Sequence, residues 1–200
     1  MSKINLRSYD PATRYITEES LRLFKEDDRI EISELIHHLL ACPDLPMHCP
    51  QHHYLVTAAM LSVAFKAQGR SQEELSDALL EAMMRAKNVL PAFCGLYGSC
   101  GTAVGLGIYA SILQDCDQYS EKSWALSNKI VGDCLSKISQ IEGPRCCKRN
   151  TYLALEVGLA FSKEHFQLNL GDSSKIVCRH YMRNVQDCKK SACPFYPVNI

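Results

Sequence analysis

Residues 50–69, PQHHYLVTAAMLSVAFKAQG, have the pattern of one complete helix. Pro50 suits the first helical position, because its fixed backbone angle matches a helix and its missing amide hydrogen is not needed there. Gly69 suits the position just after a helix, where a left-handed backbone conformation is common. Cys49 is then expected at the N-cap. The stretch therefore predicts a helix as the starting point of the fold.

The rest of the chain continues the helical pattern, and no run of alternating apolar and polar residues predicts a strand. Ser71 and Glu74 have the spacing of a capping box, and Asn150 is a good N-cap residue. We expect an all-α domain of about six helices followed by an irregular cysteine-rich C-terminal tail. Besides the helix quoted above, the helices are expected at residues 32–42, 71–90, 102–113, 121–141 and 150–166.

Length and composition favour a single domain over residues 1–200, with residues 1–28 as a peripheral N-terminal segment. Lys plus Arg equals Asp plus Glu at 22 each, so no global charge draws the protein to nucleic acid or to an anionic membrane. The N-terminus lacks the apolar region of a secretory signal, which favours a cytoplasmic protein. Residues 89–113 carry no charge, but their glycines and proline predict a buried loop and helix rather than a membrane span.

Cysteine is the residue type that carries the functional signal, because the chain has 11 of them. An odd number in a reducing compartment does not predict a disulfide framework. Three of them are expected to be buried and inert, namely Cys42, Cys116 and Cys134. The other eight lie in four motifs: Cys49 in MHCPQHH, Cys94 and Cys100 in FCGLYGSCG, Cys146 and Cys147 in GPRCCKR, and Cys178, Cys188 and Cys193 in the tail.

These motif cysteines lie near predicted helix N-termini or in glycine-containing turns, and both places stabilise the thiolate that binds metal. We expect them to form one or two metal centres. The tail spacing Cys178-x9-Cys188-x4-Cys193-Pro resembles the end of a ferredoxin-like ligand set, and it supplies three ligands for a 4Fe-4S cluster. Cys147 or Cys49 is expected to provide the fourth. A zinc ion that organises the polar tail is the alternative.

Histidines accompany the first of these motifs. His48, His52 and His53 flank Cys49, and a helix places Cys49, His52 and His53 on one face. They are candidates for a zinc ligand set or for hydrogen-bonding partners around the metal ligands.

The adjacent pair Cys146 and Cys147 raises a separate question, because neighbouring cysteines rarely chelate one metal without strain. We interpret one as a metal ligand and the other as a reactive, bridging or second-site thiol; a vicinal disulfide or a buried pair is the alternative. Arg145, Lys148 and Arg149 would offset the charge of a thiolate-ligated cluster or hold an anionic substrate, unless they form a solvated basic turn. Cys146, Cys147 and Arg145 are the catalytic candidates.

Taken together, the motifs MHCPQHHYLV, FCGLYGSCGTAVGLGI, GPRCCKRNTYLAL and DCKKSACPF resemble a cysteine-rich domain family of unknown function from anaerobic archaea and bacteria. The resemblance covers about residues 47–196. Members are sometimes attached to a methyltransferase domain. The resemblance implies an anaerobic setting and a shared site, but no established activity.

The expected function is therefore an oxygen-sensitive redox or sulfur-transfer protein that takes a small anionic or sulfur-containing substrate. The alternative is a non-enzymatic module, stabilised by a cluster or by zinc, that docks on a methyltransferase or a redox protein. The sequence contains no P-loop, dinucleotide-binding, serine-hydrolase or HExxH motif. A Cys-His nucleophile formed by Cys49 or Cys94 with His48 or His53 is a further alternative.

Overall fold

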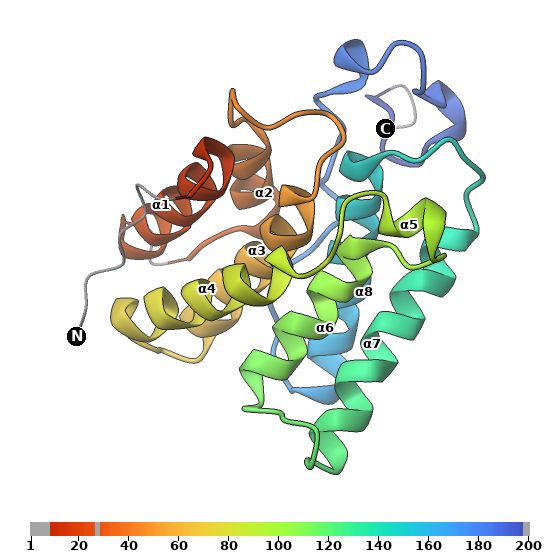
Figure 1. The fold of residues 1–200 in the computed structure, drawn as a ribbon. Helices are drawn as coiled ribbons and strands as arrows, with labels where there is room; N and C mark the ends of the chain where they lie inside the picture. Colours follow the sequence, from red (N-terminus) through yellow and green to blue (C-terminus); the bar gives the residue numbers. More distant parts are fainter. Residues whose placement is uncertain (1–8, 27–28, 198–200) are drawn as a thin grey trace.

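The structure is a computed structural model that describes residues 9–26 and 29–197. Within these residues the chain forms eight α-helices, two short 3-10 turns and no strand (Figure 1). The all-α prediction is confirmed, and the two helices that the sequence did not predict are the N-terminal one and a four-residue one. The elements are α1 (Pro11–Glu26), α2 (Ile32–Leu40), α3 (Gln51–Ala67), α4 (Gln72–Lys87), α5 (Phe93–Leu96), α6 (Gly101–Leu113), α7 (Lys122–Ser139), α8 (Cys147–His165), η2 (Tyr181–Arg183) and η3 (Lys190–Ala192).

Helix α3, the helix of the quoted stretch, lies at the centre of the domain. It packs against α1, α2, α4, α6 and α8. Its buried residues occur on every side, which is typical of a helix surrounded by other helices. The N-cap is Pro50, so Cys49 lies one residue before the N-cap and not at it, as we expected.

Helix α6 approaches α3 closely because two of its residues have no side chain. A Cβ atom on Gly105 would overlap the backbone oxygen of His53, and one on Gly101 would overlap the His53 ring. Thr57 Oγ1 donates a hydrogen bond to the Gly105 oxygen at 2.8 Å. The contact brings the beginning of α6, and with it Cys100, next to the beginning of α3.

The N-terminal helix α1 also belongs to the core. Ile16 is fully buried, and Leu23 and Phe24 are buried beside it. The hydroxyls of Thr17 and Tyr54 form a 2.7 Å hydrogen bond between α1 and α3. Of the segment that we expected to be peripheral, 1–28, residues 9–26 are thus part of the packed domain, and residues 1–8 and 27–28 lie outside the described residues.

Helix α8 begins four residues earlier than a helix capped by Asn150 would. Its N-cap is Cys146 rather than Asn150. The C-terminal tail lies beside this end of α8 (Figure 1), where Lys189 Nζ donates to the Gly143 oxygen at 3.0 Å. In the described residues, no helix combines the length and the apolar character that a membrane span requires.

Candidate functional site

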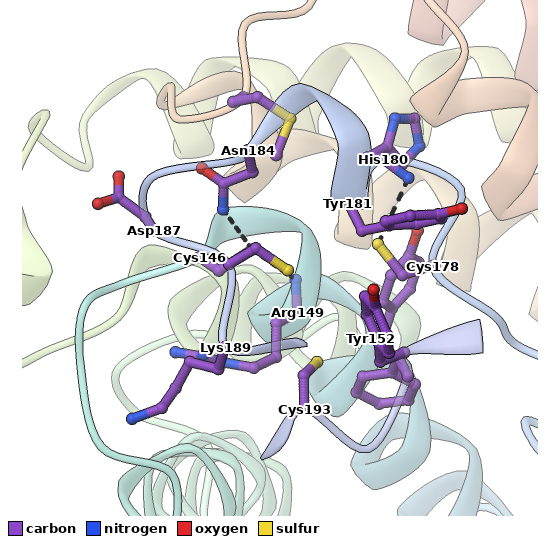
Figure 2. A pocket seen from close by; sticks show the side chains of 14 residues that line it. Cys146, Arg149, Tyr152, Cys178, His180, Tyr181, Asn184, Asp187, Lys189 and Cys193 are labelled. Atoms are coloured by element: carbon purple, nitrogen blue, oxygen red, sulfur yellow. Dashed lines mark hydrogen bonds between the residues drawn. The ribbon is translucent and has the colours of Figure 1, made fainter. Parts of the chain in front are cut away.

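Four cysteines line one cavity between the start of α8 and the tail, which we call the tail pocket. They are Cys146, Cys178, Cys188 and Cys193. The cavity contains about 390 Å³ of space, part of it open to solvent. Figure 2 shows the sulfur atoms of Cys146, Cys178 and Cys193 around this space. The fourth cysteine that lines this pocket is Cys146, whereas Cys147 and Cys49, which we expected beside the tail cysteines, do not line it.

Each sulfur of the tail pocket receives a backbone amide hydrogen. For Cys146 the donor is the amide of Arg149 in the first turn of α8, at 3.5 Å, and the Asn184 side chain donates as well, at 3.9 Å. For the three tail cysteines the donor is the amide two residues further along the chain. The pairs are His180 to Cys178 at 3.4 Å, Lys190 to Cys188 at 3.4 Å, and Phe195 to Cys193. Such hydrogen bonds favour the thiolate over the thiol.

The thiols of the tail pocket are close enough to interact electrostatically. Burial raises the pKa of Cys178, and the neighbouring Cys146, Cys193 and Cys188 raise it further. Deprotonating several of these thiols at once therefore requires a positive charge nearby. Arg149, which is only 5% exposed, supplies one at the wall of the pocket.

Aromatic rings and two unpartnered donors complete the tail pocket. Tyr152 packs on Phe195 at a centroid distance of 5.1 Å, and Tyr181 packs on Tyr196 at 5.2 Å. The Tyr152 hydroxyl and the Arg149 Nε atom are buried without a hydrogen-bond partner among the described residues. Buried donors are normally satisfied, so an acceptor in this pocket fits both.

A second set of thiols, Cys49, Cys100 and Cys147, lies outside the tail pocket, and we call it the second thiol group. Burial raises the pKa of Cys147 to about 12; the Cys49 amide lowers it, whereas the Cys100 and Cys49 thiols raise it. The three residues stand at the beginnings of α3, α6 and α8, which pack against one another. Three positive helix ends therefore converge on the group.

Polar side chains contact two of the three sulfur atoms of the second thiol group, those of Cys100 and Cys49. Asn150 Nδ2 donates to Cys100 Sγ at 3.3 Å, and the Thr102 hydroxyl lies 3.0 Å from the same sulfur. His52, which is fully buried, places Nδ1 3.3 Å from Cys49 Sγ.

The two other histidines of the motif also lie nearby. His48 Nδ1 accepts from the Cys147 amide at 3.5 Å. The ring of His53 packs against Gly101. All three histidines of the motif therefore lie around the second thiol group.

Lys148 is buried near cysteines of both sets of thiols. Its side chain is 0% exposed, and Nζ has no hydrogen-bond partner among the described residues. Burial lowers the pKa of Lys148 to about 8, while Cys49, Cys147 and Cys146 act in the opposite direction. The predicted alternative of a solvated basic turn thus fits Arg145, which is exposed, but not Lys148 or Arg149.

A more open groove borders the second thiol group. It is lined by Cys94, Cys100, Arg145, Arg149 and Asn150 together with the end of α7, and it contains about 1330 Å³, part of it open to solvent. Cys94 lies in the short helix α5. The groove brings the glycine-rich motif next to the basic residues of the GPRCCKR motif.

The sequence matches the family of unknown function DUF5714 over residues 21–196. The chain belongs to this family. The match includes every cysteine of the tail pocket and of the second thiol group, and it begins within α1, earlier than the resemblance drawn from the motifs alone. Neither the curated proteins nor the solved structures contain a match to the chain.

In this DUF5714 chain the structure thus separates the eight motif cysteines into two groups of four and three, with Cys94 on the groove wall. No three His, Cys, Asp or Glu side chains in the described part of the chain are close enough together to hold a metal ion. Outside the motifs, Cys42 and Cys134 are buried as expected, whereas Cys116 is half-buried.

Two polar residues of the tail pocket, Tyr152 and Asn184, were not predicted from the sequence. Tyr152 follows Arg149 by three residues, a spacing that places both on one face of a helix, so this signal was available. Asn184 had no such signal, because its contact with Cys146 depends on the path of the tail.

Proposed function

We propose that this DUF5714 protein is an iron-sulfur protein with a redox role, and that Cys146, Cys178, Cys188 and Cys193 hold its cluster in the tail pocket. The observation that carries the proposal is that four thiols from two distant segments line one cavity, each with an amide donor. Four cysteines are the usual ligand set of a 4Fe-4S cluster, and hydrogen bonds to sulfur tune its potential. When bound, such a cluster accepts and releases single electrons.

One feature of the tail pocket favours a cluster over a single zinc ion. A cluster brings inorganic sulfide, which accepts hydrogen bonds, and the Tyr152 hydroxyl and Arg149 Nε at this pocket are buried donors without a partner among the described residues. Zinc bound by four thiolates offers those donors no acceptor beyond the cysteines themselves.

The cluster suggests the setting of the protein. An iron-sulfur centre that reacts with oxygen suits the reducing cytoplasm of an anaerobe. The groove lined by Arg145 and Cys94 suits a small anionic or sulfur-containing substrate, since guanidinium groups bind anions well. A redox protein or a methyltransferase is the partner class that we propose for electron exchange or docking.

Anaerobic purification followed by iron, zinc and acid-labile sulfide analysis tests the proposal. We expect iron and sulfide in comparable amounts, a brown protein, and a marked loss of both in Cys178→Ser. The matched control is Cys116→Ser, because Cys116 is also half-buried but lies outside both thiol groups. Stoichiometric zinc without sulfide would replace the cluster by a structural zinc site, and it would favour the non-enzymatic docking module.

A further inference from the structure

We propose that the groove beside the end of α7 binds a small organic anion, whose charge lies near Arg145, whose hydrocarbon part lies along α7, and whose polar part lies next to the thiol of Cys100. The inference rests on the proposed function only in taking this groove as the substrate site, and it requires no cluster in the tail pocket. Three observations carry it: the charges around the groove, its apolar wall, and a buried acceptor beside a thiol.

The charges around the groove are positive. Arg145 and Arg149 line it, and none of the described residues that line it is acidic. Lys189 Nζ donates to the oxygen of Gly143, another lining residue, at 3.0 Å, which adds a third cation beside the groove. Glu142, the acidic residue of this turn, is exposed and does not line the groove. Guanidinium groups bind carboxylate and phosphate oxygens well, and positive surroundings raise the local concentration of anions.

The apolar wall of the groove comes from α7. Leu135 and Ile138 on this helix and Ile141 just after it line the groove, and all three are half-buried against the core. Leu135 and Ile138 are three residues apart, so they lie on one face of the helix. A ligand with a hydrocarbon part gains free energy by covering this wall, whereas an inorganic anion does not. The wall and the charges together therefore favour an organic anion.

A buried acceptor and a thiol lie together at the groove. Asn150 is 6% exposed, its Nδ2 donates to Cys100 Sγ at 3.3 Å, and its Oδ1 has no hydrogen-bond partner among the described residues. Buried polar atoms are normally satisfied, so an N–H or O–H group of a ligand fits Oδ1. Both residues line the groove, and the Thr102 hydroxyl lies 3.0 Å from the same sulfur. A ligand that satisfies Asn150 therefore lies next to the Cys100 thiol.

Two alkylating reagents of nearly equal size test the preference for anions. Iodoacetate carries a carboxylate and iodoacetamide does not, so the ratio of their rates at one cysteine isolates the effect of charge. Mass spectrometry measures this ratio at Cys100 in protein purified without oxygen, and iron and sulfide are measured on the same samples. Arg145→Gln is the test variant, because Arg145 is exposed and does not line the tail pocket. Arg179→Gln is the matched control, since Arg179 is exposed but lines a different pocket.

We expect the iodoacetate-to-iodoacetamide ratio at Cys100 to be about five- to tenfold higher in the folded protein than in the urea-unfolded protein. Arg145→Gln should remove most of this preference, and Arg179→Gln should leave it unchanged. Circular dichroism and gel filtration check that both variants are folded. Equal ratios in the folded and unfolded wild type, or a preference that survives Arg145→Gln, would overturn the anion site.

Isothermal titration calorimetry tests the ligand class without alkylation. Hexanoate should bind more tightly than acetate, because only hexanoate covers the apolar wall, and hexylamine should not bind, because its charge is positive. Arg145→Gln should weaken hexanoate binding about fivefold. Hexanoate that binds no better than acetate or hexylamine would show that the groove does not select an organic anion.

The same samples separate this inference from the proposed function. Iron and sulfide without a charge preference at Cys100 would overturn the anion site and leave the cluster in place. A charge preference in protein without iron and sulfide would support the anion site and overturn the cluster.

Discussion

At the scale of single residues, the position of a cysteine relative to a helix end decides which group it joins. Cys146 and Cys147 are neighbours in the chain, but the first belongs to the extended N-cap and the second to the helix. Asn150, the residue that looked most like an N-cap, uses its side chain for Cys100 instead. A local preference for capping is thus overridden by a contact with another helix.

His37 gives a prediction about pH. Burial, followed by Arg179 and His38, lowers the pKa of His37 from 6.5 to about 4. As the pH falls below 6.5, the unfolded chain binds a proton that folded His37 does not bind, so stability present above pH 6.5 is lost toward pH 4. His37 should account for about 1 kcal/mol of the loss between pH 7 and pH 5.5.

Urea unfolding at the two pH values, at equal metal content, measures this contribution. His37→Gln should lose less stability than the wild type by that amount, because glutamine does not titrate. His38→Gln is the matched control, since His38 is its exposed neighbour on α2. An identical pH dependence in wild type and His37→Gln would contradict the prediction.

At the scale of elements, the close approach of α3 and α6 positions the second thiol group. Gly105 faces the backbone of His53 and the side chain of Val56, and backbone cannot move aside as a flexible side chain can. Gly105→Ala should therefore lower the free energy of unfolding by about 1–3 kcal/mol. The variant should also let Cys100, the N-cap of α6, react faster with iodoacetamide, because α6 has to shift away from α3.

The matched control is Gly132→Ala on α7. A Cβ atom at Gly132 meets nothing within 4 Å, so alanine should stabilise the helix by about 0.5–1 kcal/mol. Urea unfolding of both variants is the measurement. A Gly105→Ala protein as stable as the wild type would show that the two helices are not held this closely.

At the scale of the whole molecule, the helical core and the tail differ in what holds them. The core is a continuous set of buried apolar side chains that includes Ile16, Leu55 and Leu106. The tail contributes few buried apolar side chains, chiefly Ile176 and Phe195. Its stability should therefore depend on what the tail pocket binds. If the proposed cluster is bound in the tail pocket, its removal should loosen the tail and leave the helices folded.

Limited trypsin digestion before and after metal removal measures the difference. We expect cleavage at Lys175, Arg179 and Lys189 to become more than about tenfold faster, while α3 and α6 stay resistant and the helical circular dichroism persists. Unchanged cleavage of the tail would mean that protein contacts alone hold it. Loss of all helical signal would mean that the metal also holds the core.

The parts of the fold that were predictable depend on residues close in sequence. The capping box of Ser71 and Glu74 is present, because both partners lie within one helical turn. α2 begins at Ile32, where its apolar pattern begins, and ends at Leu40, slightly before the stop that Cys42 and Pro43 predicted. α1 was missed although it buries Ile16, since its apolar face is interrupted by threonines and a serine that are also buried.

The helical fold and the grouping of eight cysteines in four motifs were both visible in the sequence. Helix periodicity and capping act within about four residues, and each motif is a short stretch of chain, so neither needs the tertiary structure to be recognised. Which thiols lie near one another depends on how the helices pack. Cys49, Cys100 and Cys147 are far apart in the chain, but each stands at the beginning of a helix, and these helices pack together. Cys146 and Cys147 are adjacent in the chain, but only Cys146 lines the tail pocket. Helix packing sets the first arrangement and a single change from extended to helical backbone sets the second.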